Sequence, residues 1–173
     1  MENQRQHGKL AFVDGITGLF TPADTQKSRD RVLRSGKVED VKTQVEAALG
    51  DLKTEKKVLV VDQVDALLAM GTTDALSLQN ALLTLRESAN SAVVTLAVDG
   101  PLIQGQTTTL EREHAALVLG QTHVADEVVS LRKLDTGAAG DVSGVLRVAG
   151  RESLELLYHV AGDGNVKVFE RGT

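Results

Sequence analysis

The 173 residues have an ordinary globular composition, with 42% hydrophobic and 25% charged residues, which fits one domain with a sizeable core over residues 1–173. The absence of cysteine excludes disulfides and thiolate metal sites, and an aromatic content of 2% removes the usual stacking platforms for single-stranded nucleic acid. A formal net charge of −5 argues against nucleic-acid binding by bulk charge. No apolar run approaches the roughly 20 residues of a membrane span, so we expect a soluble intracellular protein.

The first part of the chain predicts a strand, a loop and a helix. Lys9 to Asp14 is a short apolar run that ends in a carboxylate, which is typical of a strand. A buried strand so close to the first residue indicates that an N-terminal portion is missing. Thr21 to Gly36 contains Pro22, clusters charge and lacks an apolar period, so we expect a loop. The apolar positions from Lys37 to Leu52 repeat at helical spacing and predict a helix.

The centre of the chain predicts a parallel strand–helix–strand unit. Lys56 to Asp62 is a valine-rich run, bounded by lysines and an aspartate, that is typical of a strand buried on both faces. A helical pattern follows from Thr73 to Ser88, and a second buried run, Ala92 to Val98, ends at Asp99. The carboxylate of Asp62 matches the outline of a Walker B strand, where it would hold Mg²⁺ or its water beside phosphates.

The second half of the chain changes from helical to strand periodicity. Thr108 and Glu111 form a capping-box pattern, at the start of a helix that we expect to run to Leu119 and to stop at Gly120. Alternating runs separated by glycine turns then predict four strands: Glu127–Leu134, Val145–Val148, Leu154–Val160 and Asn165–Glu170. Gly162 to Asn165 predicts a hairpin turn. The expected fold class is α/β, with a parallel-to-mixed sheet, flanking helices and a β-rich C-terminal extension of that sheet.

A phosphate-binding loop is absent from the sequence. The P-loop needs Gly-x-x-x-x-Gly-Lys-Ser/Thr, whereas Gly8-Lys9 and Gly36-Lys37 are followed by leucine and valine. Without such a cradle, we expect Asp62 to end a strand or cap a turn rather than to contact a nucleotide. Asp14 and Asp99, at the tips of the other two strands, would line the same sheet edge, which is a common arrangement in α/β folds.

Catalytic and metal-binding patterns are also absent from the sequence. The four histidines lack ligand spacing, so we expect no zinc site, and we expect His114 and His159 to be structural or solvent-facing. No Gly-x-Ser-x-Gly nucleophile elbow is present, although the sequence leaves a Ser-His-Asp triad open. We therefore predict no catalytic residue, no metal and no cofactor.

The most basic segment runs from Gln26 to Lys37. It carries one acid and five basic residues: Lys27, Arg29, Arg31, Arg34 and Lys37. Two interpretations stay open, a solvated surface loop and a loop that contacts RNA phosphates without reading sequence. A weaker basic group lies in the β-rich part: Arg132, Lys133, Arg147 and Arg151.

Six stretches carry a family pattern in combination: Lys9–Phe20, Val58–Asp62, His123–Arg132, Leu134–Gly137, Asp141–Gly144 and Tyr158–Phe169. Together they resemble the family of the sixth subunit of the eukaryotic Elongator complex, of fungal type. The resemblance covers nearly the whole chain. Members of this family usually carry a further strand–helix–strand portion ahead of the stretch that matches Lys9, which agrees with the missing N-terminal portion.

The resemblance implies a RecA-like ATPase fold without the Walker A signature, in which Asp62 keeps the Walker B position alone. It implies a non-catalytic subunit that assembles with the fourth and fifth subunits, two copies of each, into a heterohexameric ring. That ring joins the catalytic part of Elongator, binds tRNA and supports modification of the wobble uridine, in the cytoplasm and also in the nucleus. The alternative from another class is an independent nucleotide-dependent ATPase with an unorthodox phosphate site.

Overall fold

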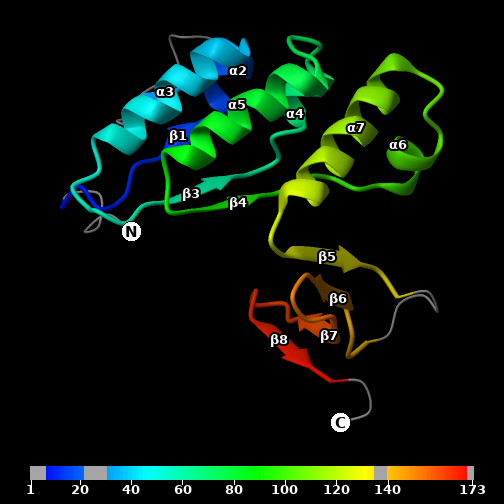
Figure 1. Ribbon diagram of the computed structural model, residues 1–173. Coiled ribbons are helices and arrows are strands. Elements are labelled where there is room, and N and C mark those ends of the chain that lie inside the picture. The colour runs from blue at the N-terminus through cyan, green and yellow to red at the C-terminus, as the bar shows by residue number, and fades with distance from the viewer. Residues whose placement is uncertain (1–6, 22–30, 135–139, 171–173) are drawn as a thin grey trace. The chain divides into compact units, whose positions relative to one another are not determined.

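The computed structural model describes residues 7–21, 31–134 and 140–170, and it divides into two compact units. Unit 1 comprises residues 1–121 and unit 2 residues 122–173. Small parallel sheets with flanking helices make up unit 1, and a four-stranded antiparallel sheet makes up unit 2 (Figure 1). The mixed α/β class expected from the sequence is therefore confirmed.

Unit 1 contains two short parallel sheets. One pairs β1 (Val13–Asp14) with β2 (Arg31–Val32), and the other pairs β3 (Val58–Val61) with β4 (Ser91–Val94). Strand β2 lies in a segment that we expected to be loop throughout, because a two-residue strand is too short to show a period. The flanking helices are α2 (Thr17–Phe20), α3 (Val38–Gly50), α4 (Ala66–Ala69), α5 (Ala75–Glu87), α6 (Gly100–Gln104) and α7 (Thr109–Val124).

The predicted parallel strand–helix–strand unit is present as β3, α5 and β4. Figure 1 shows α3 and α5 side by side over these two strands, and their apolar residues form one core. The expectation that the first strand is buried on both faces is wrong, because Val58 and Val60 are 61% and 63% exposed while Leu59 is buried. The buried members of the core are Val38, Val64, Leu67, Leu68, Ala75, Leu78, Ala81, Leu82 and Leu117.

Two carboxylates accept hydrogen bonds from the N-terminal amides of α5, one at its own N-cap and one from α7. Asp74 at the N-cap accepts a hydrogen bond from the Ser77 amide at 2.8 Å, and this bond lowers the pKa of Asp74. Glu113 of α7 accepts a hydrogen bond from the Ala75 amide at 2.6 Å. The positive end of the α5 dipole favours both carboxylates. The second bond also ties α7 to the start of α5.

Helix α7 begins at the predicted capping box. The Thr108 hydroxyl accepts a hydrogen bond from the Glu111 amide at 3.2 Å, and the Glu111 carboxylate accepts one from the Thr108 amide at 2.8 Å. The helix does not stop at Gly120 but continues to Val124. A Cβ at residue 120 would lie 2.3 Å from Gln79 Nε2, so Gly120 fits a close approach of α5 rather than a helix end.

Acid is expected to weaken the α7 capping box through Glu111. Hydrogen bonds from the Thr108 amide and from the Thr107 hydroxyl and amide lower the Glu111 pKa from 4.5 to about 2. A lowered folded-state pKa gives stability that is present above pH 4.5 and is lost as the pH falls toward 2. Urea titrations from pH 6 to pH 3 should show the stability difference between wild type and Glu111→Gln shrinking on acidification. A difference that stays constant over this range would contradict the capping role of the charge.

Unit 2 is a meander of four antiparallel strands. They are β5 (Val128–Arg132), β6 (Gly144–Ala149), β7 (Leu154–Val160) and β8 (Val166–Phe169). The predicted hairpin joins β7 to β8, with Gly164 at φ +85° and a 2.9 Å hydrogen bond from the Ala161 amide to the Asn165 carbonyl. In the described residues these strands form a sheet of their own, so the expectation that they extend the parallel sheet is wrong.

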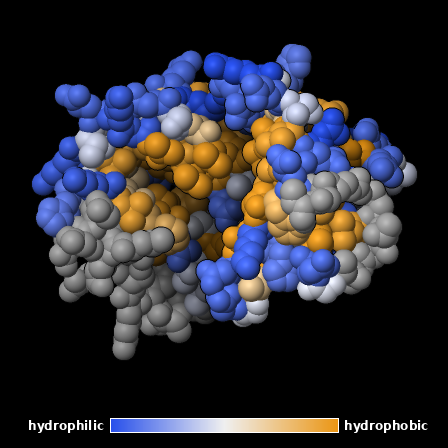
Figure 2. Space-filling model, turned by 90° about the horizontal axis from the view of Figure 1, so that it is seen from below, coloured by the Kyte–Doolittle hydropathy of each residue, from blue (hydrophilic) through white to orange (hydrophobic). Residues whose placement is uncertain are grey.

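The unit 2 sheet has one apolar face and one mixed face. The register places Val129, Val148 and Leu154 in one cross-strand row and Leu131, Leu146 and Leu156 in the next. The opposite face carries Ser130, Arg147 and Glu155 in one row. Figure 2 shows hydrophobic groups reaching the molecular surface between hydrophilic ones.

Among the described helices, none is long and apolar enough to cross a membrane.

Candidate functional site

The carboxylate predicted at the Walker B position lies at the carboxyl end of β3, beside the end of β4. Asp62 accepts a hydrogen bond from the Thr95 hydroxyl, and that hydroxyl accepts one from the Gln63 amide at 2.8 Å. Gln63 has a φ of +51°, in the left-handed region. Asp62 thus helps to hold the ends of two parallel strands together. The sequence did not point to Thr95, because its pairing with Asp62 depends on strand register.

The other two carboxylates predicted at strand tips have different surroundings. Asp14 Oδ1 accepts hydrogen bonds from the amides of Thr17, at 2.8 Å, and Ile16, at 3.0 Å. Hydrogen bonding by Thr17, followed by that of Ile16, lowers the Asp14 pKa. Asp99 is five residues beyond the last residue of β4 and precedes α6, so the expectation that it ends the strand is wrong. Asp14 therefore caps a turn at its own strand.

The basic residues of the predicted segment that the structure describes lie in different places. Lys27 and Arg29 lie outside the described residues. Arg31 begins β2 and forms an ion pair with Asp51, at the end of α3. Lys37 is the N-cap residue of α3, at the other end of that helix. Arg34 lies between Arg31 and Lys37 in the chain and is exposed. Their RNA contact stays a prediction.

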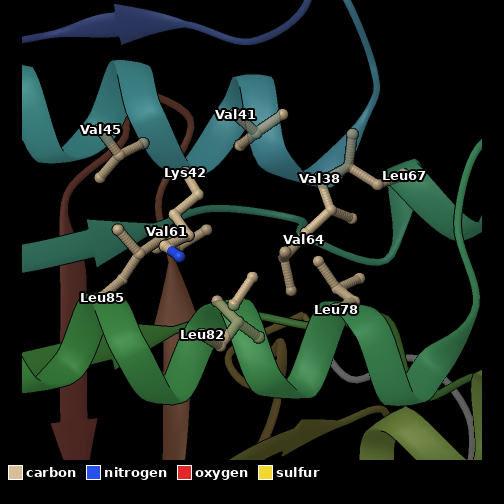
Figure 3. Close-up of a pocket in the computed structure, with 11 residues that line it drawn as sticks. Val38, Val41, Lys42, Val45, Val61, Val64, Leu67, Leu78, Leu82 and Leu85 are labelled. Carbon is tan, nitrogen blue, oxygen red and sulfur yellow. The ribbon is translucent and has the colours of Figure 1, made fainter.

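A small apolar cavity lies between α3, α5 and β3. Its volume is about 30 Å³, and the side chains of Val41, Val45, Val61 and Leu82 point toward it (Figure 3). Binding pockets for small molecules usually enclose about 300 to 1,000 Å³. Lys42 also lines the cavity, but only apolar atoms face it, and these offer water no hydrogen-bond partner. This cavity is a packing defect of the core and not a ligand site.

Filling the cavity should stabilise unit 1. Val45→Ile adds one methylene beside the cavity without changing the branching of the side chain, so we expect the free energy of unfolding to rise by up to about 1 kcal/mol. Val93→Ile adds the same group at a position that is 52% exposed and should change little. Chemical denaturation of both variants measures the difference. A Val45→Ile protein no more stable than Val93→Ile would contradict a usable void.

The histidines and acids show no metal site within the described part of the chain. His114 of α7 is 4% exposed, and its Nε2 lies 2.8 Å from the Ala97 carbonyl oxygen, which fixes the ring against the segment after β4. Of the two roles expected for His114, structural or solvent-facing, the structure shows the structural one. His159 is half-buried in β7.

The chain is similar to a curated protein that is named for a complex. The chain is 24% identical over 179 aligned residues to a protein of the fission yeast Schizosaccharomyces pombe named Elongator complex protein 6 homolog. The alignment covers 93% of this chain and 67% of the relative. The chain is a distant homologue of that Elongator protein. No family model matches the chain. The alignment with the fission yeast protein confirms the resemblance stated from the sequence.

Proposed function

We propose that this Elongator subunit 6-like chain is a non-catalytic subunit of an Elongator complex. It forms a RecA-like heterohexameric ring with the fourth and fifth subunits, and the ring binds tRNA and supports modification of the wobble uridine. The observation that carries the proposal is the homology over 93% of the chain to a protein named for that complex.

The strand-end geometry supports a subunit without its own nucleotide chemistry. Asp62 is engaged by the Thr95 hydroxyl, and the sequence contains no P-loop that would cradle a triphosphate beside it. A carboxylate alone provides one ligand for Mg²⁺, which in nucleotide sites is held by carboxylates together with the phosphates. Asp62 therefore acts as a structural link between β3 and β4.

Exposed apolar residues on both units support assembly with other proteins. The outer face of the β3–β4 pair carries Val58, Val60 and Val93, all more than half exposed. The apolar face of the unit 2 sheet carries Val129 and Leu131, which are exposed as well. Parallel sheets are ordinarily covered on both faces, and large apolar patches mark interaction sites. Such faces need a cover from elsewhere in the chain or from a partner.

The proposal is tested by co-expressing the tagged chain with the fourth and fifth Elongator subunits of its own source. Both subunits should co-purify with the tag through a high-salt wash, because apolar interfaces are not screened by salt. Calorimetry of the isolated chain with ATP and Mg²⁺ should show no micromolar binding. Recovery of the chain without either subunit, together with micromolar ATP binding, would favour the independent ATPase instead.

A further inference from the structure

Four lysines gather at the amino end of β3 in unit 1. Lys56 and Lys57 directly precede the strand, and Lys53 lies three residues before them. The Lys53 amide donates a 2.9 Å hydrogen bond to the Gly8 carbonyl, which places Lys9 beside this segment. Figure 1 shows the blue start of the described chain next to the turn that leads into β3. We call Lys9, Lys53, Lys56 and Lys57 the amino-end cluster.

The backbone that carries the amino-end cluster is fixed by hydrogen bonds. The Lys57 amide donates to Asn90 Oδ1 at 2.8 Å, and the Asn90 amide donates to the Lys57 carbonyl at 2.9 Å. These two bonds lock the start of β3 to the turn before β4. Lys9, Lys53 and Lys56 are exposed, and Lys57 is half-buried. A fixed backbone lets flexible lysine side chains converge on one ligand at a lower entropic cost.

The charge at this edge is not neutralised within the described part of the chain. None of the four lysines forms an ion pair there, and the nearby Asp51 is held by Arg31. Glu55 is the one acid between Lys53 and Lys56. In a protein of net charge −5, this edge therefore concentrates positive charge.

We propose that the amino-end cluster contacts the phosphate backbone of RNA, which rests on the tRNA binding of the proposed function. A lysine ammonium is a compact point charge that suits phosphate oxygens without reading base sequence. Lysine is depleted in the cores of protein–protein interfaces, so an all-lysine cluster fits a polyanion better than a folded protein. Arg31 lies at the same edge through its ion pair with Asp51, whereas Lys37 lies at the opposite end of α3.

The test compares two double variants of the full chain, each assembled with its partner subunits. Lys53→Glu/Lys56→Glu reverses two exposed charges of the cluster, and Lys133→Glu/Lys167→Glu makes the same charge change in unit 2. Fluorescence anisotropy with an unmodified tRNA transcript, over a series of salt concentrations, measures affinity. The cluster variant should bind at least about tenfold more weakly, and its salt slope should fall by about two, one for each lost phosphate contact. The unit 2 variant should change affinity by less than about threefold.

Each other outcome overturns the inference in a recognisable way. If the wild-type assembly forms but does not bind tRNA, the inference fails together with the tRNA part of the proposed function, while the subunit assignment stands. If the wild type binds and both variants bind equally well, the inference alone fails. If the cluster variant loses its partner subunits instead of tRNA, the lysines belong to a protein interface. Circular dichroism and thermal melting confirm that both variants are folded.

Discussion

Replacing Leu117 with alanine is expected to lower the free energy of unfolding by about 2 to 5 kcal/mol. Leu117 lies on α7 with 0% of its surface exposed, and it belongs to the core that α3, α4 and α5 share. Truncation removes buried methyl groups and leaves a cavity, because helices fixed at both ends close only partly around it. Urea denaturation followed by circular dichroism measures the loss.

The matched control is Leu119→Ala on the same helix. Leu119 is 61% exposed, so the same truncation should change stability by less than about 0.5 kcal/mol. Both substitutions give α7 the same gain in helix propensity, which cancels in the comparison. Equal effects of the two variants would contradict the packing of α7 against the core of unit 1.

Replacing Gly144 with alanine is expected to separate β5 from β6. A Cβ at residue 144 would lie 2.4 Å from the Arg132 carbonyl oxygen and 2.8 Å from the Tyr158 ring. The closest atom belongs to the backbone, which cannot turn aside as a side chain can. Overpacking of this kind costs about 1 to 3 kcal/mol. Hydrogen exchange should show faster exchange of the β5 and β6 amides.

Gly162→Ala provides the control for this substitution. A Cβ at residue 162 would meet no atom within 4 Å, so the variant should keep wild-type exchange rates in β5 and β6. Hydrogen exchange reports local opening, so it isolates unit 2 even if unit 1 stays folded. Unchanged protection in Gly144→Ala would show that the sheet does not have the described register.

Local patterns in the sequence predicted local structure well. Alternation predicted β7 with the bounds that it has in the structure, Leu154–Val160. The Thr108–Glu111 capping box was found at the start of α7 because both of its hydrogen bonds lie within four residues of sequence. In each case neighbouring residues determine the outcome, so the sequence carries the whole signal.

Contacts between distant segments were not predictable from the same patterns. The end of α7 was predicted wrongly because Gly120 leaves room for the Gln79 side chain of α5 and does not end its own helix. The sheet to which the last four strands belong depends on pairing between strands, which alternation does not specify. The link between Asp62 and Thr95 and the approach of Lys9 to Lys53 were not predictable for the same reason. They bring together residues more than 30 positions apart in the chain.

The native mass of the chain, co-expressed with the fourth and fifth Elongator subunits, tests the central claim most directly. Size-exclusion chromatography with light scattering gives this mass without a label. The account predicts one species that contains two copies of each of the three subunits. A chain that elutes as a monomer, apart from both well-folded subunits, would contradict it.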